Sequence, residues 1–402
     1  MVLRVVVVTT VHPRDRRGLI LIGMRAALLA AGVSLLLAVP TASPAQTAHT
    51  AHTAPTAQTA GPARVDGWPT TTAVEAGFRP ARLDAIAADA RAEDSTCLAV
   101  VRGGRLVRDW NWGTPRTTPR EVFSITKSIT SALVGIAVRD GDLALDDPVA
   151  DHVPSWAGTD SATVTVRNLL SNDSGRFWSL DSDYNQMTHA PDRTAYAVGL
   201  SQQYPVGTAW AYNNAAIQVL DAVLRSATGV PTHEFAADRL FRPLGMTHTR
   251  MTTNAGGTAT NVYFGANTTC LDLARFAQLY LHRGKVGGKR ILDRAYVDAS
   301  TGRSSTTLNA AYGYLWWLNR YGVVRGSTDP VDEHGQPVVE HVGQLVPGAA
   351  RSLFSAIGLG GQIAMVDRAS GTIVVRLGTG QIAAPTTYGL RDAARVVTEA
   401  LR

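Results

Sequence analysis

A serine and a lysine three residues apart could form a nucleophile and its base. Ser124 and Lys127 lie in the stretch FSITKS (residues 123–128), at the start of an apolar segment. Residues i and i+3 share one face of a helix, so a helix here would place the hydroxyl beside the amine. A lysine on a helix that enters a core is desolvated, which lowers its pKa and favours the neutral amine. A neutral amine can accept the proton of a serine, and the pattern therefore predicts nucleophilic catalysis.

Lys127 stands out in a chain that hardly uses lysine. The sequence has three lysines against 35 arginines. Lys285 and Lys289 lie in a polar, glycine-rich stretch, whereas Lys127 lies among apolar residues. An isolated Ser-x-x-Lys recurs by chance, as a helix-capping serine followed by a solvated lysine. The position of this rare lysine favours the catalytic interpretation.

A tyrosine and an asparagine follow about 88 residues later. Tyr212 and Asn214 lie in PVGTAWAYNN (residues 205–214), which runs into a predicted helix. A tyrosine beside a lysine can relay protons, and an asparagine amide can hold a carbonyl group or the lysine. The alternative is a packing tyrosine and a helix cap.

A glycine-rich turn near the C-terminus could bind an oxyanion. Gly358, Leu359, Gly360 and Gly361 lie between two predicted strands. Glycines let the backbone approach a ligand closely, so a main-chain N–H here could donate to developing negative charge. The alternative is an ordinary tight turn.

These residues must be positioned by helices and strands that the hydrophobic periodicity predicts. We expect helices over residues 80–93, 124–138, 215–227, 270–282 and 390–401. We expect strands over residues 97–101, 105–110, 352–357, 362–366 and 372–377.

Strands at both ends of the chain and helices between them predict an α/β (α+β) fold. We expect one antiparallel sheet built from the N- and C-terminal strands and covered by the terminal helices. A large, mostly helical insertion would span roughly 145–300 of a domain that covers residues 65–402. The absence of βαβ alternation argues against Rossmann and TIM-barrel folds.

The first 64 residues do not look like part of the folded domain. Arg25 precedes a 14-residue uncharged run (26–39) and a small-residue exit at 41–45, the pattern of a secretory signal. We expect cleavage after Ala45, with a retained N-terminal anchor as the alternative. Residues 46–64 form a Thr/Ala-rich spacer that cannot bury a core. The chain is therefore predicted to be exported to the cell envelope or secreted, and to meet a membrane only if the leader is retained.

The net charge of +6 does not indicate a nucleic-acid partner. Without residues 1–45, 33 basic and 31 acidic residues remain, and no basic run is interleaved with aromatic residues. The two cysteines, Cys97 and Cys270, could form a disulfide in an exported protein or remain two buried thiols.

Several longer stretches carry a resemblance to a known family. They are FSITKSITSALVGIAVRDGDLALDDPV, LLSNDSG, YPVGTAWAYNNAAIQVLDAVL, RLFRPLGM, and SAIGLGGQIAMVD followed by IVVRLG. Over most of residues 70–402 the chain resembles the serine β-lactamase/penicillin-binding-protein superfamily, on its class C side. The resemblance is closest to family VIII-type esterases and 6-aminohexanoate-dimer (nylon oligomer) hydrolases.

The resemblance implies a role for each residue of the core motifs. Ser124 would be the acylated nucleophile and Lys127 the base that activates it. Tyr212 would protonate the leaving group and help to activate the deacylating water. The backbone N–H groups of Ser124 and of a residue in 358–361, with Leu359 as the first choice, would form the oxyanion hole.

The same resemblance implies three residues that contact or support the substrate. Asn214 would support substrate and lysine. Trp178 and Tyr184 lie where the nylon-oligomer hydrolases contact their substrate.

One departure from the family pattern affects the expected substrate. β-Lactamases and transpeptidases carry Lys-Thr-Gly or His-Thr-Gly on the C-terminal strand, where it meets the substrate carboxylate. Here the strand reads SAIG (355–358), and the nearest match, His341-Val342-Gly343, lies too far before it.

We therefore expect an exported serine hydrolase that cleaves esters or amides. A β-lactamase or D,D-peptidase is the alternative, and a non-catalytic binding protein of the same fold is a third. The expected partner is a small-molecule ester, amide or lactam. No cofactor or metal is predicted, and the oligomeric state is not indicated.

Overall fold

The computed structural model describes residues 64–402 except 330, 337, 339–340 and 381–385. The predicted signal (1–45) and all but the last residue of the predicted spacer (46–64) lie outside the described residues. Within the described part, no helix is both long and apolar enough to cross a bilayer.

A six-stranded antiparallel sheet joins the two ends of the described chain. Its strand order is β10-β13-β14-β15-β3-β4, so the N-terminal hairpin pairs with the C-terminal strands through β3 and β15. The strands are β3 (Ser95–Arg102), β4 (Arg105–Asn111), β10 (Trp317–Leu318), β13 (Leu353–Gly358), β14 (Gln362–Asp367) and β15 (Thr372–Gly378). The expected fold class is confirmed; the short edge strand β10 was not expected, because two residues are too few to show a period.

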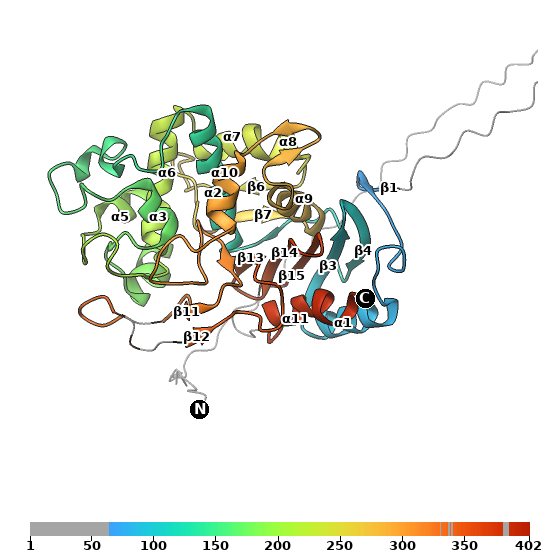
Figure 1. Ribbon diagram of the computed structural model, residues 1–402. Coiled ribbons are helices and arrows are strands. Elements are labelled where there is room, and N and C mark those ends of the chain that lie inside the picture. The colour runs from blue at the N-terminus through green and yellow to red at the C-terminus, as the bar shows by residue number, and fades with distance from the viewer. Residues whose placement is uncertain (1–63, 330, 337, 339–340, 381–385) are drawn as a thin grey trace, which may run out of the picture. The chain divides into compact units, whose positions relative to one another are not determined.

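Helices cover both faces of this sheet, and the alternation along β3 shows why. Leu98 and Val100 pack with the terminal helices, α1 (Pro80–Ala92) and α11 (Leu390–Arg395). Ala99 and Val101 face the opposite way, into the larger core that also holds α2 (Ile125–Asp140) and α9 (Cys270–Leu281). Successive side chains of a strand point to opposite faces, so a strand buried on both sides is apolar throughout. Figure 1 shows α1 and α11 along one face of the sheet.

The region between the strands is mostly helical. Its further helices are α3 (Val166–Ser171), α4 (Met187–His189), α5 (Arg193–Gly199), α6 (Asn214–Thr228), α7 (Thr232–Ala236), α8 (Arg242–Leu244) and α10 (Arg294–Thr301). The helices α2 and α6 end at Gly141 and Gly229, which both adopt the left-handed conformation. The last helix is shorter than expected, because the π-helical turn Val396–Ala400 follows α11.

Short strands complete the described structure. A three-stranded sheet holds β5 (Arg120–Glu121), β7 (Ala266–Thr268) and β6 (Arg250–Met251) in that order. The paired strands are β1 (Arg64–Val65) with β2 (Trp68–Pro69), β8 (Lys285–Val286) with β9 (Lys289–Arg290), and β11 (Gly322–Val324) with β12 (His341–Gly343).

Candidate active site

Ser124 immediately precedes the first residue of α2. Phe123 before it has a φ of 46°, in the left-handed region that a bulky residue rarely adopts. The end of β13 passes close by, since a Cβ on Gly358 would lie 2.3 Å from the Val122 carbonyl oxygen. Strained backbone of this kind persists where the surrounding structure holds it, and it presents Ser124 at the junction of helix and sheet.

Lys127 lies one turn into the same helix and points at the serine. Its Nζ donates to the Ser124 Oγ at 2.8 Å and to the Tyr263 carbonyl oxygen at 2.8 Å. Only 1% of the residue is exposed, and this burial lowers the pKa of Lys127 to about 7. The amine is therefore neutral in a large fraction of molecules at neutral pH.

Tyr212 reaches the serine from the loop that leads into α6. Its side chain interacts with Ser124, and Lys127 Nζ lies 4.8 Å from the centroid of its ring. Burial raises the pKa of Tyr212 above its usual range, so the phenol stays protonated. Its ring stacks on Trp317 at 5.6 Å and meets Tyr312 edge to face at 6.0 Å. The aromatic neighbours leave the phenol little freedom to move.

Trp178 hydrogen bonds to the backbone of Tyr212. Its indole Nε1 donates to the Tyr212 carbonyl oxygen at 3.1 Å. Two cavities, whose linings are given below, open at Ser124, and the Trp178 side chain lines neither of them. The structure thus places this expected substrate contact next to the backbone of the tyrosine. Tyr184, the other expected contact, lines both cavities.

Asn214 is the first residue of α6 and lines one of the cavities. Tyr184 lies beside its side chain, whose Oδ1 is buried with no partner among the described residues. The hydrogen bonds of Lys127 go to Ser124 and to the Tyr263 carbonyl oxygen. Asn214 thus lines the cavity and does not hydrogen bond to the lysine in the described structure.

Asp183 is a member of the site that the sequence did not reveal. Its carboxylate accepts the backbone N–H groups of Asn214 at 2.6 Å and Ala215 at 3.2 Å, at the N-terminus of α6. Burial raises the pKa of Asp183, and the nearby Lys127 ammonium opposes that shift. Asp183 lies in a π-helical turn (Ser182–Gln186), 31 residues before Asn214, and belongs to no sequence motif, so only its position in the fold identifies it.

The glycine-rich turn between β13 and β14 lies opposite Ser124. Leu359 is 52% exposed and lines both cavities beside the serine. Gly360 and Gly361 adopt φ values of 74° and 70°, which glycine accepts without strain. Among the described residues, no acceptor takes the N–H of Ser124 or of Leu359. Two backbone donors are thus available beside the hydroxyl.

Two cavities of about 390 Å³ each meet at Ser124, Tyr184 and Leu359. The first is also lined by Tyr212, Trp317, Val324, Arg325, Gly326, Ser327, Leu345, Ile357 and Gly358. The second is also lined by Glu121, Phe123, Asp183, Thr188, Arg193, Asn214, Tyr263 and Phe264. A substrate could therefore extend from the serine in two directions. His341 lies exposed on β12 and lines neither cavity.

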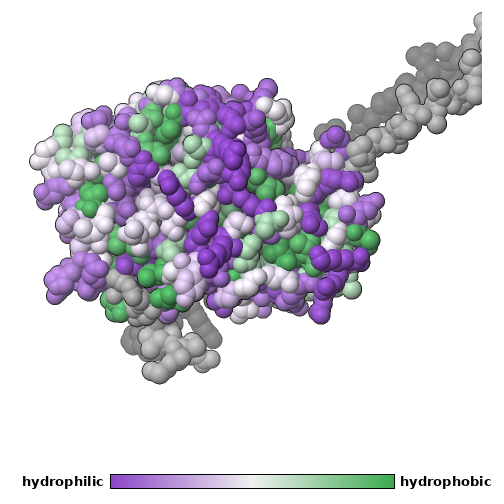
Figure 2. Space-filling view, viewed as in Figure 1, coloured by the Kyte–Doolittle hydropathy of each residue, from purple (hydrophilic) through white to green (hydrophobic). Residues whose placement is uncertain are grey.

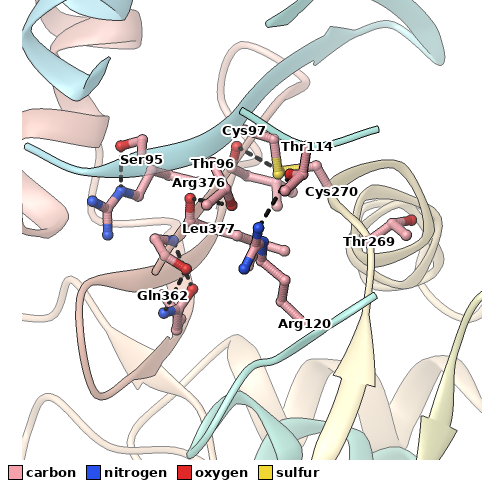
Figure 3. The surroundings of a disulfide bond; sticks show 12 residues. Ser95, Thr96, Cys97, Thr114, Arg120, Thr269, Cys270, Gln362, Arg376 and Leu377 are labelled. Carbon is pink, nitrogen blue, oxygen red and sulfur yellow. Dashed lines mark hydrogen bonds between the residues drawn. A yellow bond between two sulfur atoms is a disulfide. The ribbon is translucent and has the colours of Figure 1, made fainter. Parts of the chain in front are cut away.

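The disulfide lies away from these cavities. Cys97 on β3 is bonded to Cys270, the first residue of α9, across 173 residues of chain (Figure 3). The two cysteines therefore form a disulfide and are not two separate buried thiols.

On the face of the molecule that Figure 2 shows, apolar residues are scattered among hydrophilic ones.

The fold has counterparts among known proteins. The family model described as beta-lactamase matches residues 83–398, and the chain belongs to the beta-lactamase family. A beta-lactamase from Lysobacter lactamgenus is 27% identical over 199 residues, which cover 44% of this chain and 51% of that protein. The chain thus matches about half of the length of this relative.

Solved structures share the fold at low identity. A provisionally assigned 6-aminohexanoate-dimer hydrolase from Bacillus anthracis is similar, with a TM-score of 0.62 and 18% identity over 82% of this chain and 84% of that one. A family VIII carboxylesterase is similar with a TM-score of 0.56 and 16% identity, over 79% of this chain and 95% of that one. These likenesses extend across both the sheet and the helical region.

Proposed function

We propose that the protein is a serine hydrolase that cleaves ester or amide bonds through an acyl-enzyme on Ser124. One observation carries the proposal: the buried Lys127 amine, whose pKa is lowered to about 7, lies 2.8 Å from the Ser124 hydroxyl. Membership in the beta-lactamase family supports it. Similarity to a carboxylesterase and to a 6-aminohexanoate-dimer hydrolase supports the fold that carries this site.

In the acylation step, Lys127 Nζ takes the proton from Ser124 Oγ as the oxygen attacks the substrate carbonyl carbon. The N–H groups of Ser124 and Leu359 stabilise the negative charge that develops on the carbonyl oxygen. The tetrahedral intermediate collapses and breaks the bond to the leaving alcohol or amine. Tyr212 donates a proton to this leaving group and regains one from Lys127.

Deacylation uses the same groups in reverse. A water molecule attacks the acyl carbon, and its proton passes through Tyr212 to Lys127. The Ser124 oxygen then leaves and recovers a proton from the lysine. Tyr212 acts as a neutral relay, since its raised pKa makes a tyrosinate base unfavourable at neutral pH.

Replacement of the nucleophile tests the proposal. Ser124→Ala should reduce p-nitrophenyl butyrate hydrolysis by several orders of magnitude, as loss of a nucleophile generally does. It should also abolish labelling by a fluorophosphonate probe. Ser128→Ala is the matched control, because Ser128 lies on the same helix but bonds to the Leu315 carbonyl oxygen. Equal activity of Ser124→Ala and the wild type would refute the proposal.

A β-lactamase or D,D-peptidase is the second candidate. Arg325 lines the first cavity with Ser124 and Tyr212, so this cavity includes a cation that could meet a substrate carboxylate. Nitrocefin turnover faster than ester turnover, or stable labelling by a fluorescent penicillin, would favour this candidate. Trapped acyl-enzymes from esters and linear amides alone would favour the first.

We further propose that the protein is exported. The predicted signal at residues 1–45 and the Cys97–Cys270 disulfide support this, because disulfides persist in oxidising compartments. Mass spectrometry of the protein from culture supernatant should show an N-terminus near Gln46. Recovery of only the full-length chain in the cytoplasm would contradict export.

A further inference from the structure

A buried arginine lies directly behind the Leu359–Gly361 turn. Arg376 on β15 is 0% exposed. Its Nη1 donates to the carbonyl oxygens of Gly360 at 2.8 Å and Gly361 at 3.0 Å. Its other nitrogens bind Ser95 Oγ at 2.7 Å and the Glu93 carbonyl oxygen, and Figure 3 shows the contact with Ser95.

The backbone segments that come closest to the guanidinium have glycine at the points of contact. A Cβ on Gly361 would lie 2.6 Å from Arg376 Nη1, and a Cβ on Gly378 would lie 2.5 Å from it. Either contact would displace the guanidinium or the turn. Gly361 therefore has two functions: it adopts the left-handed turn conformation, and it gives Arg376 access to the turn carbonyls.

Two of the four hydrogen bonds of this guanidinium go to the turn, and the other two go to Ser95 and Glu93. Among the described residues its acceptors are three carbonyl oxygens and one hydroxyl, and none is a carboxylate. A buried charge is costly unless its hydrogen bonds are made, and the desolvation penalty makes buried charges poor sources of stability. A planar guanidinium does, however, hold two neighbouring carbonyl groups in a fixed geometry.

We propose that Arg376 is a positioning residue for catalysis. By holding the carbonyl groups of Gly360 and Gly361, it fixes the turn whose first residue, Leu359, offers its N–H to the oxyanion. The inference rests on the proposed function, since the oxyanion forms only if Ser124 attacks a carbonyl. Arg376 touches no substrate and acts only through the turn.

The test compares Arg376 with a matched arginine at the other end of the same strand pair. Arg102 on β3 also donates to two carbonyl oxygens, those of Ser370 and Ala76, and a Cβ on Gly77 would lie 2.6 Å from its Nη1. It pairs with Thr372, whereas Arg376 pairs with Leu98. Arg376→Met and Arg102→Met should both lower the melting temperature, but only the first should impair catalysis.

The expected effects are specific to the transition state. In Arg376→Met, kcat for p-nitrophenyl butyrate should fall about 100-fold, as displacement of an oxyanion donor generally costs, while KM changes little. Inhibition by phenylboronic acid, whose tetrahedral adduct on Ser124 places an oxygen in the oxyanion hole, should weaken in parallel. Arg376→Lys keeps the positive charge but loses the planar guanidinium that binds two neighbouring carbonyl groups, and its kcat should fall about tenfold.

Two outcomes separate this inference from the proposed function. If fluorophosphonate does not label Ser124 of the wild type, the proposed function fails and this inference fails with it. If the wild type is labelled but Arg376→Met has the kcat and boronate affinity of Arg102→Met, only the inference is overturned. If Arg376→Met does not fold, unchanged kcat in Arg376→Lys overturns the inference.

Discussion

The amine of Lys127 lies 2.8 Å from the hydroxyl of Ser124, inside a core that leaves only 1% of the lysine exposed. The contact and the burial have the same origin, because both residues begin a helix whose next turns are apolar. The helix sets the distance between base and nucleophile, and burial in the core lowers the pKa of the base to about 7.

The first prediction concerns the pH dependence of this pair. Burial lowers the pKa of Lys127 to about 7, and the neutral amine is the active form. Values of kcat/KM should therefore rise with pH and level off above about pH 7. Lys127→Arg should lose at least about a thousandfold in activity, because a guanidinium cannot be deprotonated. Lys285→Arg, on exposed β8, should be unaffected; a flat pH profile would contradict the assignment.

The second prediction concerns Asp183. Its negative charge favours the protonated form of Lys127 and so raises the pKa of the lysine. Asp183→Asn removes the charge, so the pKa of Lys127 should fall further and the rise in kcat/KM should move to lower pH. Asp183→Ala also removes the acceptor for two N–H groups at the start of α6 and should destabilise the protein by about 1–2 kcal/mol.

Asp181 provides the control for that experiment. It lies in the same stretch, but it is exposed, and its side chain bonds to Asn185 and Gln186 alone within the described part of the chain. Asp181→Asn should leave the pH profile unchanged. A shift of the profile in Asp181→Asn as large as in Asp183→Asn would mean that the charge of Asp183 has no special effect on Lys127.

The third prediction separates support of Tyr212 from substrate contact. Trp178→Phe removes the hydrogen bond to the Tyr212 carbonyl oxygen, which is worth about 1 kcal/mol. The value of kcat should fall about fivefold and KM should stay nearly constant. Tyr184→Ala should instead raise KM, because Tyr184 lines both cavities. A Trp178→Phe variant with raised KM and normal kcat would make Trp178 a substrate contact.

The fourth prediction concerns the disulfide. It closes a loop of 173 residues between β3 and α9, so its removal relaxes the unfolded chain. The double variant Cys97→Ala, Cys270→Ala should lose about 2–5 kcal/mol of unfolding free energy. Neither cysteine lines a cavity at Ser124, so kcat/KM well below the melting temperature should be unchanged. Dithiothreitol should lower the melting temperature of the wild type and not that of the variant.

Much of the fold followed from local periodicity. The strands around residues 352–377 are short, mainly apolar runs separated by glycine-containing turns, and the hairpin around Gly103-Gly104 has a tight turn. Their pairing into one sheet is confirmed. The edge strand β10 and the pair β11–β12 were missed, because strands of two or three residues carry no readable period. Their positions depend on partners far along the chain.

The sequence by itself determined which residues can react: a serine and a rare lysine at helical spacing, a Tyr-x-Asn before a helix, and a glycine-rich turn. Only the tertiary structure decided what surrounds them. No motif predicts that the carboxylate of Asp183 binds the start of α6, that Trp178 donates to the Tyr212 carbonyl oxygen, or that Arg376 holds the carbonyl groups of the turn. Spacing along one helix fixes a local contact, whereas burial, pKa shifts and the support of a backbone turn arise from residues that meet only when the chain is folded.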